Sequence, residues 1–195
     1  MNDKDIVKQH FTESIQTKIS TADSMSDQIC QAGNILLQTL ISGNKIFICG
    51  NGALSSESQG FSEKMINRFN IERPPLPVID LTANSSIITA ISRDYQHDSI
   101  YSKQLYALST EQDTLITMST TGHSKNIISA IKVAKEKSLN IIALTGKNPG
   151  DISDSLQGND IIIKIESDKN CRIQENHSLI LNCFCELIEQ KLFGI

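Results

Sequence analysis

The sequence has no tryptophan, four prolines and only 5% aromatic residues in a chain of 195 residues. The shortage of aromatic side chains disfavours a platform on which nucleic-acid bases stack. The shortage of proline, and the lack of any serine-rich stretch, leaves no segment that is typical of a linker between domains. We therefore expect a single domain over residues 1–195, which is long enough for one sizeable hydrophobic core.

Basic charge and long apolar runs are scarce as well. The formal net charge is -4, so the chain lacks the basic surface that a nucleic-acid backbone requires, and we expect no direct contact with nucleic acid. No run reaches the roughly 18 apolar residues of a membrane-spanning helix, and the N-terminal segment MNDKDIVKQH has no apolar signal sequence. We expect a cytoplasmic protein without a membrane partner.

The five cysteines are odd in number and form no Cys-x-x-Cys motif. This pattern favours reduced and mostly buried thiols in a cytoplasmic protein over a disulfide framework or a cysteine metal site. The cysteines are Cys30, Cys49, Cys171, Cys183 and Cys185.

Five short apolar segments predict the strands of a parallel sheet. Each is rich in Ile, Leu or Val without strict alternation, which is typical of strands buried on both faces. About 20 to 35 residues separate their starts, which leaves room for a helical crossover each time. The sequence therefore predicts an α/β fold, a three-layer sandwich around a five-stranded parallel sheet. The segments are Lys45–Cys49, Pro77–Leu81, Thr114–Met118, Asn140–Leu144 and Asp160–Ile165.

Helices are predicted between the strands and at both ends of the chain. Residues 1–44 are expected to form N-terminal helices, broken near Ala22–Ser26, that pack on the α/β core of residues 45–195 or on another subunit. The last helix has an apolar centre, Leu179–Leu181, which predicts burial by the domain or by a second subunit. The remaining predicted helices are Ser55–Phe69, Ser85–Ser92, Asp98–Leu108, Ser124–Lys137 and Arg172–Phe193.

The loop after the first predicted strand, Gly50-Asn51-Gly52, can bring backbone N–H groups to an anion. Parallel α/β sheets bind their ligands beyond the carboxyl ends of the strands, where this loop lies. A dinucleotide motif would have a third glycine at the position of Ser55, so a dinucleotide site is disfavoured. A tight strand-to-helix turn without a ligand remains an alternative.

The loop after the third predicted strand combines four hydroxyl side chains with a glycine just before a helix. Hydroxyl groups, backbone amides and the positive end of the helix dipole together favour a phosphate group. Alternatively, Ser124 simply caps the helix, but one cap leaves the other three hydroxyls unexplained. Read alone, Thr145–Gly150 after the fourth strand predicts a generic turn. The four hydroxyl residues are Ser119, Thr120, Thr121 and Ser124.

Gly-Asn-Gly after one strand and Ser-Thr-Thr-Gly-His-Ser after a later one resemble the SIS (sugar isomerase) domain family, and Ala143–Gly146 and Arg172–His177 extend the match. The resemblance implies a flavodoxin-like sheet, a homotetramer and a sugar-phosphate ligand. Within the family the chain resembles the phosphoheptose isomerases, and most of all the group of DnaA initiator-associating proteins, in segments such as Phe11–Thr17 and Met65–Phe69. The residues implied to bind the sugar phosphate are Asn51, Gly52, Ser55, Ser119, Thr120, Thr121, Ser124 and Gln174.

The resemblance also implies a catalytic Glu and a catalytic His, and this chain has neither. The positions hold Lys64 and Asn182, and a lysine, protonated at neutral pH, is a poor general base. The family has a histidine that can hold zinc at the position that Gly60 occupies here. Gln174 alone cannot bind the metal, so we expect no zinc and no other cofactor.

Four further residues lie near these positions in the sequence. His177 shares a helix face with Gln174 and could be recruited to the site, although a structural histidine is favoured. Glu63 and Glu175 are expected to be solvated or interfacial. Leu54 takes the place of a phosphate-contacting serine, which weakens one side of the expected pocket.

We therefore expect a non-catalytic, homotetrameric protein that binds the replication initiator DnaA and promotes its assembly at the chromosomal origin. Leu192 and Phe193, near the C-terminus, are the candidate partner contact, with subunit packing as the alternative. One alternative function is phosphoheptose isomerase, which converts sedoheptulose 7-phosphate to D-glycero-D-manno-heptose 7-phosphate for lipopolysaccharide synthesis. Another is a sugar-phosphate sensor.

Overall fold

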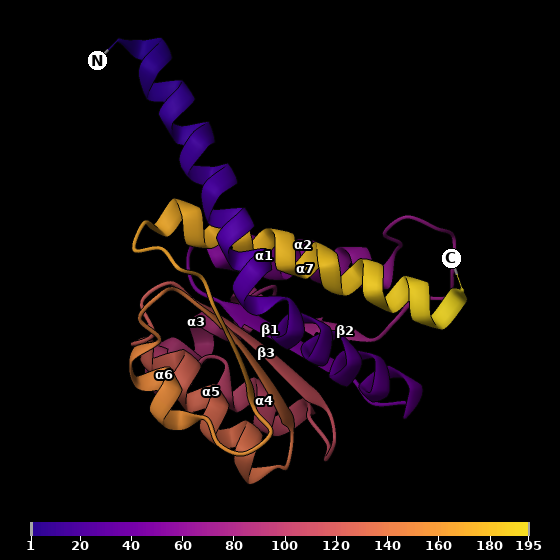
Figure 1. Cartoon of the computed structure of the whole chain (residues 1–195). Helices are drawn as coiled ribbons and strands as arrows, with labels where there is room; N and C mark the ends of the chain where they lie inside the picture. Colours follow the sequence, from indigo (N-terminus) through magenta and orange to yellow (C-terminus); the bar gives the residue numbers. More distant parts are fainter. Residues whose placement is uncertain (1, 195) are drawn as a thin grey trace.

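A computed structural model describes residues 2–194 of the chain (Figure 1). The strands are β1 (Ile46–Gly50), β2 (Val78–Asp80), β3 (Thr114–Ser119), β4 (Asn140–Thr145) and β5 (Ile161–Lys164). The helices are α1 (Asp3–Ile41), α2 (Ala53–Ile66), α3 (Ser85–Asp94), the 3-10 turn η1 (His97–Ser99), α4 (Ser102–Leu108), α5 (Lys125–Glu136), α6 (Gly150–Ser155) and α7 (Asn170–Phe193). Among the described residues, no helix is both long and apolar enough to cross a membrane.

The five strands form one parallel sheet in the order β2-β1-β3-β4-β5, which confirms the predicted fold class. β1 and β3 are buried along their whole length, as expected for strands with helices on both faces. The chain reverses its direction of travel across the sheet between β1 and β3. In open parallel sheets, ligands bind beyond the carboxyl ends of the strands at such a reversal.

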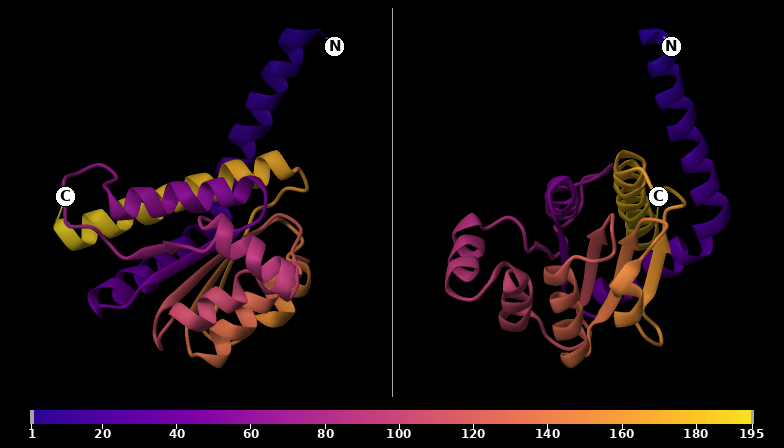
Figure 2. Two further views of the ribbon diagram at one scale, coloured as in Figure 1. Left: turned by 180° about the vertical axis from the view of Figure 1, so that it is seen from behind. Right: turned by 90° about the vertical axis from the view of Figure 1, so that its left-hand side faces the viewer.

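Helices cover both faces of the sheet and complete the predicted three layers. Helices α1, α2 and α7 pack on one face, and α4, α5 and α6 pack on the other (Figures 1 and 2). The strands alternate between two cores, so that Ile116 and Met118 face α2 and α7 while Leu115 faces α5. Because both faces are apolar, polar side chains that could hold a ligand are concentrated at the ends of the strands.

The N-terminal region is one helix, so the predicted break near Ala22–Ser26 is wrong. No glycine or proline interrupts that segment, and its hydroxyl groups do not compete with the helix. Instead, Thr21 and Ser24 donate hydrogen bonds to the carbonyl groups four residues earlier, at 2.8 Å. The first half of α1 projects beyond the sheet (Figure 2).

The turn after β4 and the end of the last helix each differ in part from the expected structure. The turn predicted at Thr145–Gly150 leads into a short helix, α6, that the sequence analysis missed. Near the end of α7, Leu192 packs against the core while Phe193 remains 37% exposed. The predicted partner contact at these residues stays a prediction, and the final residue, 195, lies outside the described residues.

A buried ion pair holds the segment between α2 and β2 against α7. Arg73 Nε donates to Glu189 Oε1 at 2.9 Å, and both side chains are almost fully buried. The Arg73 guanidinium also donates to the carbonyl oxygens of Met65 and Lys64 at the end of α2. Burial raises the pKa of Glu189, but the Asn70 amide and the Arg73 guanidinium outweigh it, and the net pKa lies below the usual value.

Replacing Arg73 by leucine should therefore destabilise the chain strongly, because it leaves Glu189 buried without its partner. We expect a loss of about 3–5 kcal/mol in the free energy of unfolding, measured by urea titration at pH 7. Arg68→Leu is the matched control, because Arg68 pairs with Glu72 at 3.6 Å on the surface, and its loss should cost less than about 1 kcal/mol. Equal effects of the two substitutions would contradict this account.

His177 is a second buried polar group, and it lies beneath the carboxyl end of β4. Its Nε2 is 3.3 Å from the carbonyl oxygen of Thr145, and its Nδ1 has no hydrogen-bond partner among the described residues. Burial lowers the pKa of His177 to about 4, so the imidazole is neutral at pH 7. This placement is that of a structural histidine.

His177 should make stability depend on pH. Between pH about 6.5 and 4 the unfolded chain binds a proton at this residue and the folded chain does not, so stability falls as the pH is lowered. The loss reaches roughly 3 kcal/mol at the acid end of this range. A His177→Gln variant should lose that component when urea unfolding is compared at pH 7.5 and pH 5, whereas the exposed His123→Gln should keep it. Identical pH dependence in His177→Gln and the unchanged chain would disprove the assignment.

Candidate functional site

The loop after β1 is tied to the start of α5 by a pair of side-chain amides. The Nδ2 groups of Asn51 and Asn126 each donate to the other's Oδ1 at 2.9 Å. The Tyr101 hydroxyl donates to the carbonyl of Gly50 at 2.9 Å and to Asn51 Oδ1 at 3.1 Å. These bonds tie the loop after β1 to the start of α5, at the reversal of strand order where a ligand is expected.

The next residues of this loop expose backbone and one hydroxyl group. Gly52 precedes α2 in the left-handed region, with φ of 59°, and nothing crowds the position where a Cβ would lie. The Ser55 hydroxyl donates to the Gly52 carbonyl at 2.7 Å. Leu54 is only 3% exposed and lies in the core, so its side chain does not line the loop.

The loop between β3 and α5 forms the hydroxyl-rich part of the site. The hydroxyl oxygens of Ser119 and Ser124 are 3.3 Å apart, and the Gly122 amide donates to Ser119 Oγ at 3.1 Å. Ser124 precedes α5 but makes no side-chain capping bond, so a capping role does not account for it. Exposure increases from buried Ser119 to exposed Thr121. We refer to Ser119, Thr120, Thr121 and Ser124 together as the hydroxyl loop.

The turn after β4 packs directly against the glycine of the hydroxyl loop. Gly122 has φ of 75°, and a Cβ there would lie 2.1 Å from the carbonyl oxygen of Pro149. The Ile152 amide donates to the Gly122 carbonyl at 3.1 Å. Only glycine fits this contact, so the turn that looked generic in the sequence is one wall of the site.

Gln174, the remaining predicted ligand residue, lies in the first turns of α7 and is half-buried. Its neighbour Ile173 packs where a Cβ on Gly146 would lie, and the Thr120 carbonyl oxygen is 2.7 Å from the same point. The start of α7 therefore meets the hydroxyl loop at the same edge of the sheet.

Lys64 and Asn182 lie together, but away from the hydroxyl loop of their own chain. Lys64 Nζ donates to Asn182 Oδ1 at 2.7 Å. Helices α2 and α7 both begin at the carboxyl edge and run back along the sheet. At 1.5 Å per residue, Lys64 is about 16 Å from the start of α2, and Asn182 is about 12 Å along α7 from Gln174. Within one chain, the pair and the loop form separate clusters.

The residues at the family's metal positions do not suit zinc. Gly60 has no side chain, and the Lys64 ammonium group is itself a hydrogen-bond donor. Within residues 2–194, no three His, Cys, Asp or Glu side chains are grouped as a metal site requires. The expectation that the chain works without zinc stays a prediction.

Two titratable residues at this edge were not singled out in the sequence. Asp80 ends β2, and its carboxylate accepts hydrogen bonds from the Thr82 amide at 2.8 Å and the Thr82 hydroxyl at 2.9 Å. His97 Nε2 lies 3.3 Å from Asn126 Nδ2. Asp80 could have been found by the rule that points to strand ends, because it lies in the predicted strand Pro77–Leu81.

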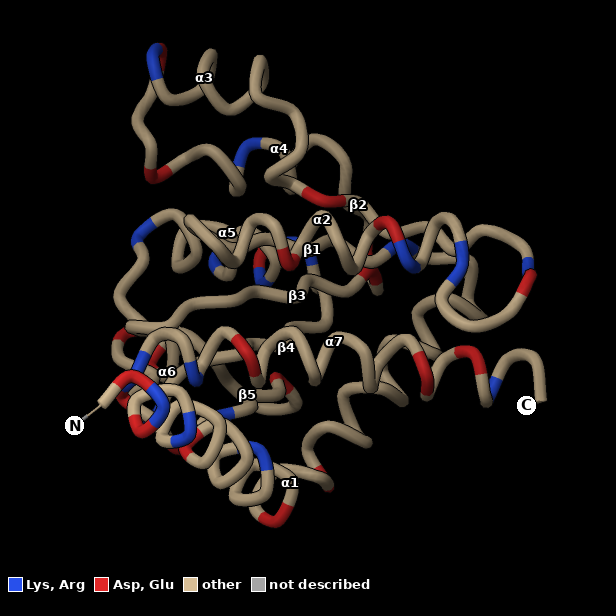
Figure 3. The backbone as a smooth tube through the Cα atoms, turned by 90° about the horizontal axis from the view of Figure 1, so that it is seen from above, with Lys and Arg blue, Asp and Glu red and all other residues tan. Residues whose placement is uncertain are grey.

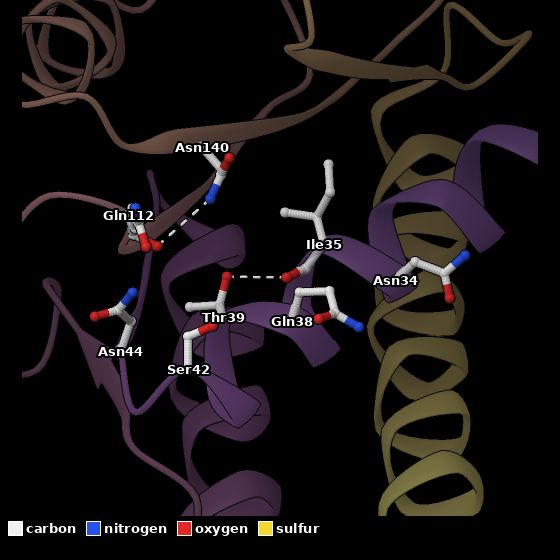
Figure 4. Close-up of a pocket in the computed structure, with 8 residues that line it drawn as sticks. All are labelled: Asn34, Ile35, Gln38, Thr39, Ser42, Asn44, Gln112 and Asn140. Carbon is white, nitrogen blue, oxygen red and sulfur yellow. Dashed lines mark hydrogen bonds between the residues drawn. The ribbon is translucent and has the colours of Figure 1, made fainter.

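Another cavity, of about 350 Å³, lies at the opposite ends of the strands (Figure 4). There Asn140 Nδ2 is 3.4 Å from the Gln112 carbonyl oxygen, and the Thr39 hydroxyl donates to the Ile35 carbonyl at 2.9 Å. All the lining side chains are uncharged, so the cavity offers no group for acid–base chemistry. They belong to Asn34, Ile35, Gln38, Thr39, Ser42, Asn44, Gln112 and Asn140.

Comparison with known proteins shows the family. The model of the SIS domain family matches residues 10–146. A phosphoheptose isomerase of Shewanella sediminis is 45% identical over 187 residues, which cover 96% of this chain and 95% of the relative. The structure of a phosphoheptose isomerase from Francisella tularensis covers 97% of this chain and all of its own, with a TM-score of 0.94 and 39% identity. The structure of phosphoheptose isomerase GmhA from Neisseria gonorrhoeae matches with a TM-score of 0.92 and 35% identity. The match covers 97% of this chain and 100% of the GmhA chain.

These similarities contradict the expectation of a non-catalytic protein that binds DnaA. The relatives are named phosphoheptose isomerase and match almost the whole chain. The expectation gave more weight to Lys64 and Asn182 than to the rest of the sequence. By its sequence and its fold, the chain belongs to the SIS domain family and, within that family, to the phosphoheptose isomerase branch.

Proposed function

We propose that the protein is a sugar-phosphate isomerase that interconverts sedoheptulose 7-phosphate and an aldose heptose 7-phosphate. The observation that carries the proposal is the hydroxyl loop at the reversal of strand order, in a chain that is 45% identical to a phosphoheptose isomerase over 96% of its length. The five free thiols favour a reducing compartment, and we propose the cytoplasm as the place of action.

In this proposal, the phosphate group lies at the start of α5. The hydroxyls of Ser119 and Ser124 are close enough to share one oxygen of the phosphate, and Gly52 lets the β1 loop approach from the other side. Helix α5 has twelve residues, so its amino end adds a favourable dipole. The sugar then extends along the carboxyl edge of the sheet toward Gln174 or toward β2.

Lys64 and Asn182 take no part in proton transfer in this proposal. Their hydrogen bond closes the contact between α2 and α7, about 16 Å along α2 from its first residue and about 12 Å along α7 from Gln174. The proposed reaction also needs no zinc, because the residues at those positions do not suit the metal.

The proposal predicts isomerase turnover by the purified chain. With sedoheptulose 7-phosphate as substrate, aldose formation should exceed that of a mock preparation and should persist after EDTA treatment. Ser119→Ala and Ser124→Ala should each raise KM by roughly 10- to 100-fold, because each loses a hydrogen bond to a charged phosphate group. Ser24→Ala, on the exposed side of α1, is the matched control and should leave KM unchanged. Turnover no greater than that of the mock preparation would overturn the proposed function.

We also propose that the chain acts as a homotetramer. Exposed apolar side chains recur every four residues on the projecting half of α1, which places them on one face of the helix. An apolar groove of about 350 Å³ lies beside them between α1 and α7, and exposed Leu179 lines it. In Figure 3, acidic and basic positions are mixed along α1, so the helix has no all-basic stripe. The four exposed residues are Val7, Phe11, Ile15 and Ile19.

The tetramer can be tested by placing charges on this face. A Phe11→Lys, Ile15→Lys double variant should shift the mass measured by light scattering from four chains to a smaller assembly, since it would bury two unpaired charges. Gln16→Lys changes an exposed polar residue of the same helix and should leave the assembly intact. A single chain in solution before any substitution would refute the tetramer.

A further inference from the structure

An isomerase must move a proton between neighbouring carbon atoms, and this chain lacks the family's usual groups for that step. A general base needs a side chain that can both accept and return the proton. Lys64 and Asn182 are unsuited, and His177 is buried beneath the strand ends. His123 is largely exposed and lies 3.1 Å from Asp151. Asp80 is the carboxylate at the carboxyl edge of the sheet next to the loop that bears Ser55.

The position of Asp80 follows from the short edge strand that it ends. Asp80 is in register with Ile48, two residues before the end of β1, and the residue after next, Thr82, reaches the start of α2. It lines a cavity of about 240 Å³ together with Gln59, Ser62 and Ala83. The Thr82 hydroxyl is 2.9 Å from Asp80 Oδ2 and 3.4 Å from the carbonyl oxygen of Ser55. One hydroxyl group therefore joins Asp80 to a predicted sugar-phosphate residue.

The charge on Asp80 is not neutralised by a basic partner. Within residues 2–194, no Lys, Arg or His lies within ion-pair distance of it. Burial raises the pKa of Asp80, and hydrogen bonds from Thr82 lower it only in part. The titratable groups that face it are Cys49 and Tyr101, and burial raises the pKa of both, so neither carries a charge near pH 7.

We propose that Asp80 is the catalytic residue that carries the proton between the two carbons of the ketose phosphate. This inference rests on the isomerase activity proposed above. A side chain that is half-buried, lines a polar cavity and is held through both oxygens by Thr82 is positioned for repeated proton transfer. The neighbouring amide of Gln59 offers hydrogen bonds to the hydroxyl groups of the sugar.

The step balances without an added reactant. An Asp80 oxygen takes a proton from the hydroxyl-bearing carbon beside the ketose carbonyl. The electron pair of that C–H bond forms a carbon–carbon double bond, and the carbonyl electrons move to oxygen. The hydroxyl proton passes from the first oxygen to the second, and the first carbon becomes the aldehyde. Asp80 then returns its proton to the former carbonyl carbon, so that nothing is oxidised or reduced overall.

The test compares Asp80→Asn with the unchanged protein, using sedoheptulose 7-phosphate. We expect kcat to fall at least about 100-fold, while the thermal shift produced by the ligand stays within about two-fold. Glu111→Gln is the matched control, because Glu111 is exposed just before the amino end of β3, and this variant should retain full kcat. An active unchanged protein with an equally active Asp80→Asn variant would overturn this inference but leave the proposed function standing. An inactive unchanged protein would overturn both.

Two outcomes remain to be separated, loss of folding and loss of binding. If Asp80→Asn loses ligand binding while circular dichroism shows it folded, Asp80 is a binding residue and the inference is wrong. If Asp80→Asn does not fold, Thr82→Val decides. That variant removes a hydrogen bond that lowers the pKa of Asp80, so the acid limb of the kcat profile should move to higher pH. An unmoved acid limb in Thr82→Val would exclude Asp80 as the base.

Discussion

The buried ion pair between Arg73 and Glu189 fixes the geometry on which one side of the site depends. β2 has only three residues and lies at the edge of the sheet, so its own hydrogen bonds hold it weakly. The segment that leads into it is held instead by a guanidinium that reaches the end of α2 and a carboxylate on α7. Because Asp80 ends this strand, the position of a carboxylate beside the β1 loop depends on charges buried at the opposite end of α2.

The fold could be predicted from the sequence because its strands are apolar on both faces, a pattern with few alternatives. The continuity of α1 could not be predicted as easily. Serine and threonine near residues 21–26 suggest a break, yet their hydroxyls bond to their own helix. The inward direction of Leu54 depends on the tight turn at Gly50, where a Cβ would lie 2.7 Å from Leu54 itself. Such a contact is decided by packing rather than by local sequence.

The candidate site follows most directly from the sequence where the residue types themselves carry the chemistry. Four hydroxyls at the end of a strand indicate an anion site from the sequence alone, and the structure brings Ser119 and Ser124 together. Residues that act by position were harder to find. Gly122 matters because Pro149 packs against it, and Asn51 because Asn126 pairs with it. The expected loss of activity rested on Lys64 and Asn182, two positions in a chain that is 45% identical to a phosphoheptose isomerase over 96% of its length.

The projecting half of α1 has a consequence for folding. Most of the stability of a helix in a protein comes from packing, and the first turns of α1 are exposed in their own chain. In the proposed tetramer a neighbouring chain covers these turns, so amide hydrogen exchange there would report on assembly, while exchange in the strands would report on global unfolding. In that assembly the two ends of one continuous helix would belong to different cooperative units, one set by protein concentration and the other by the core.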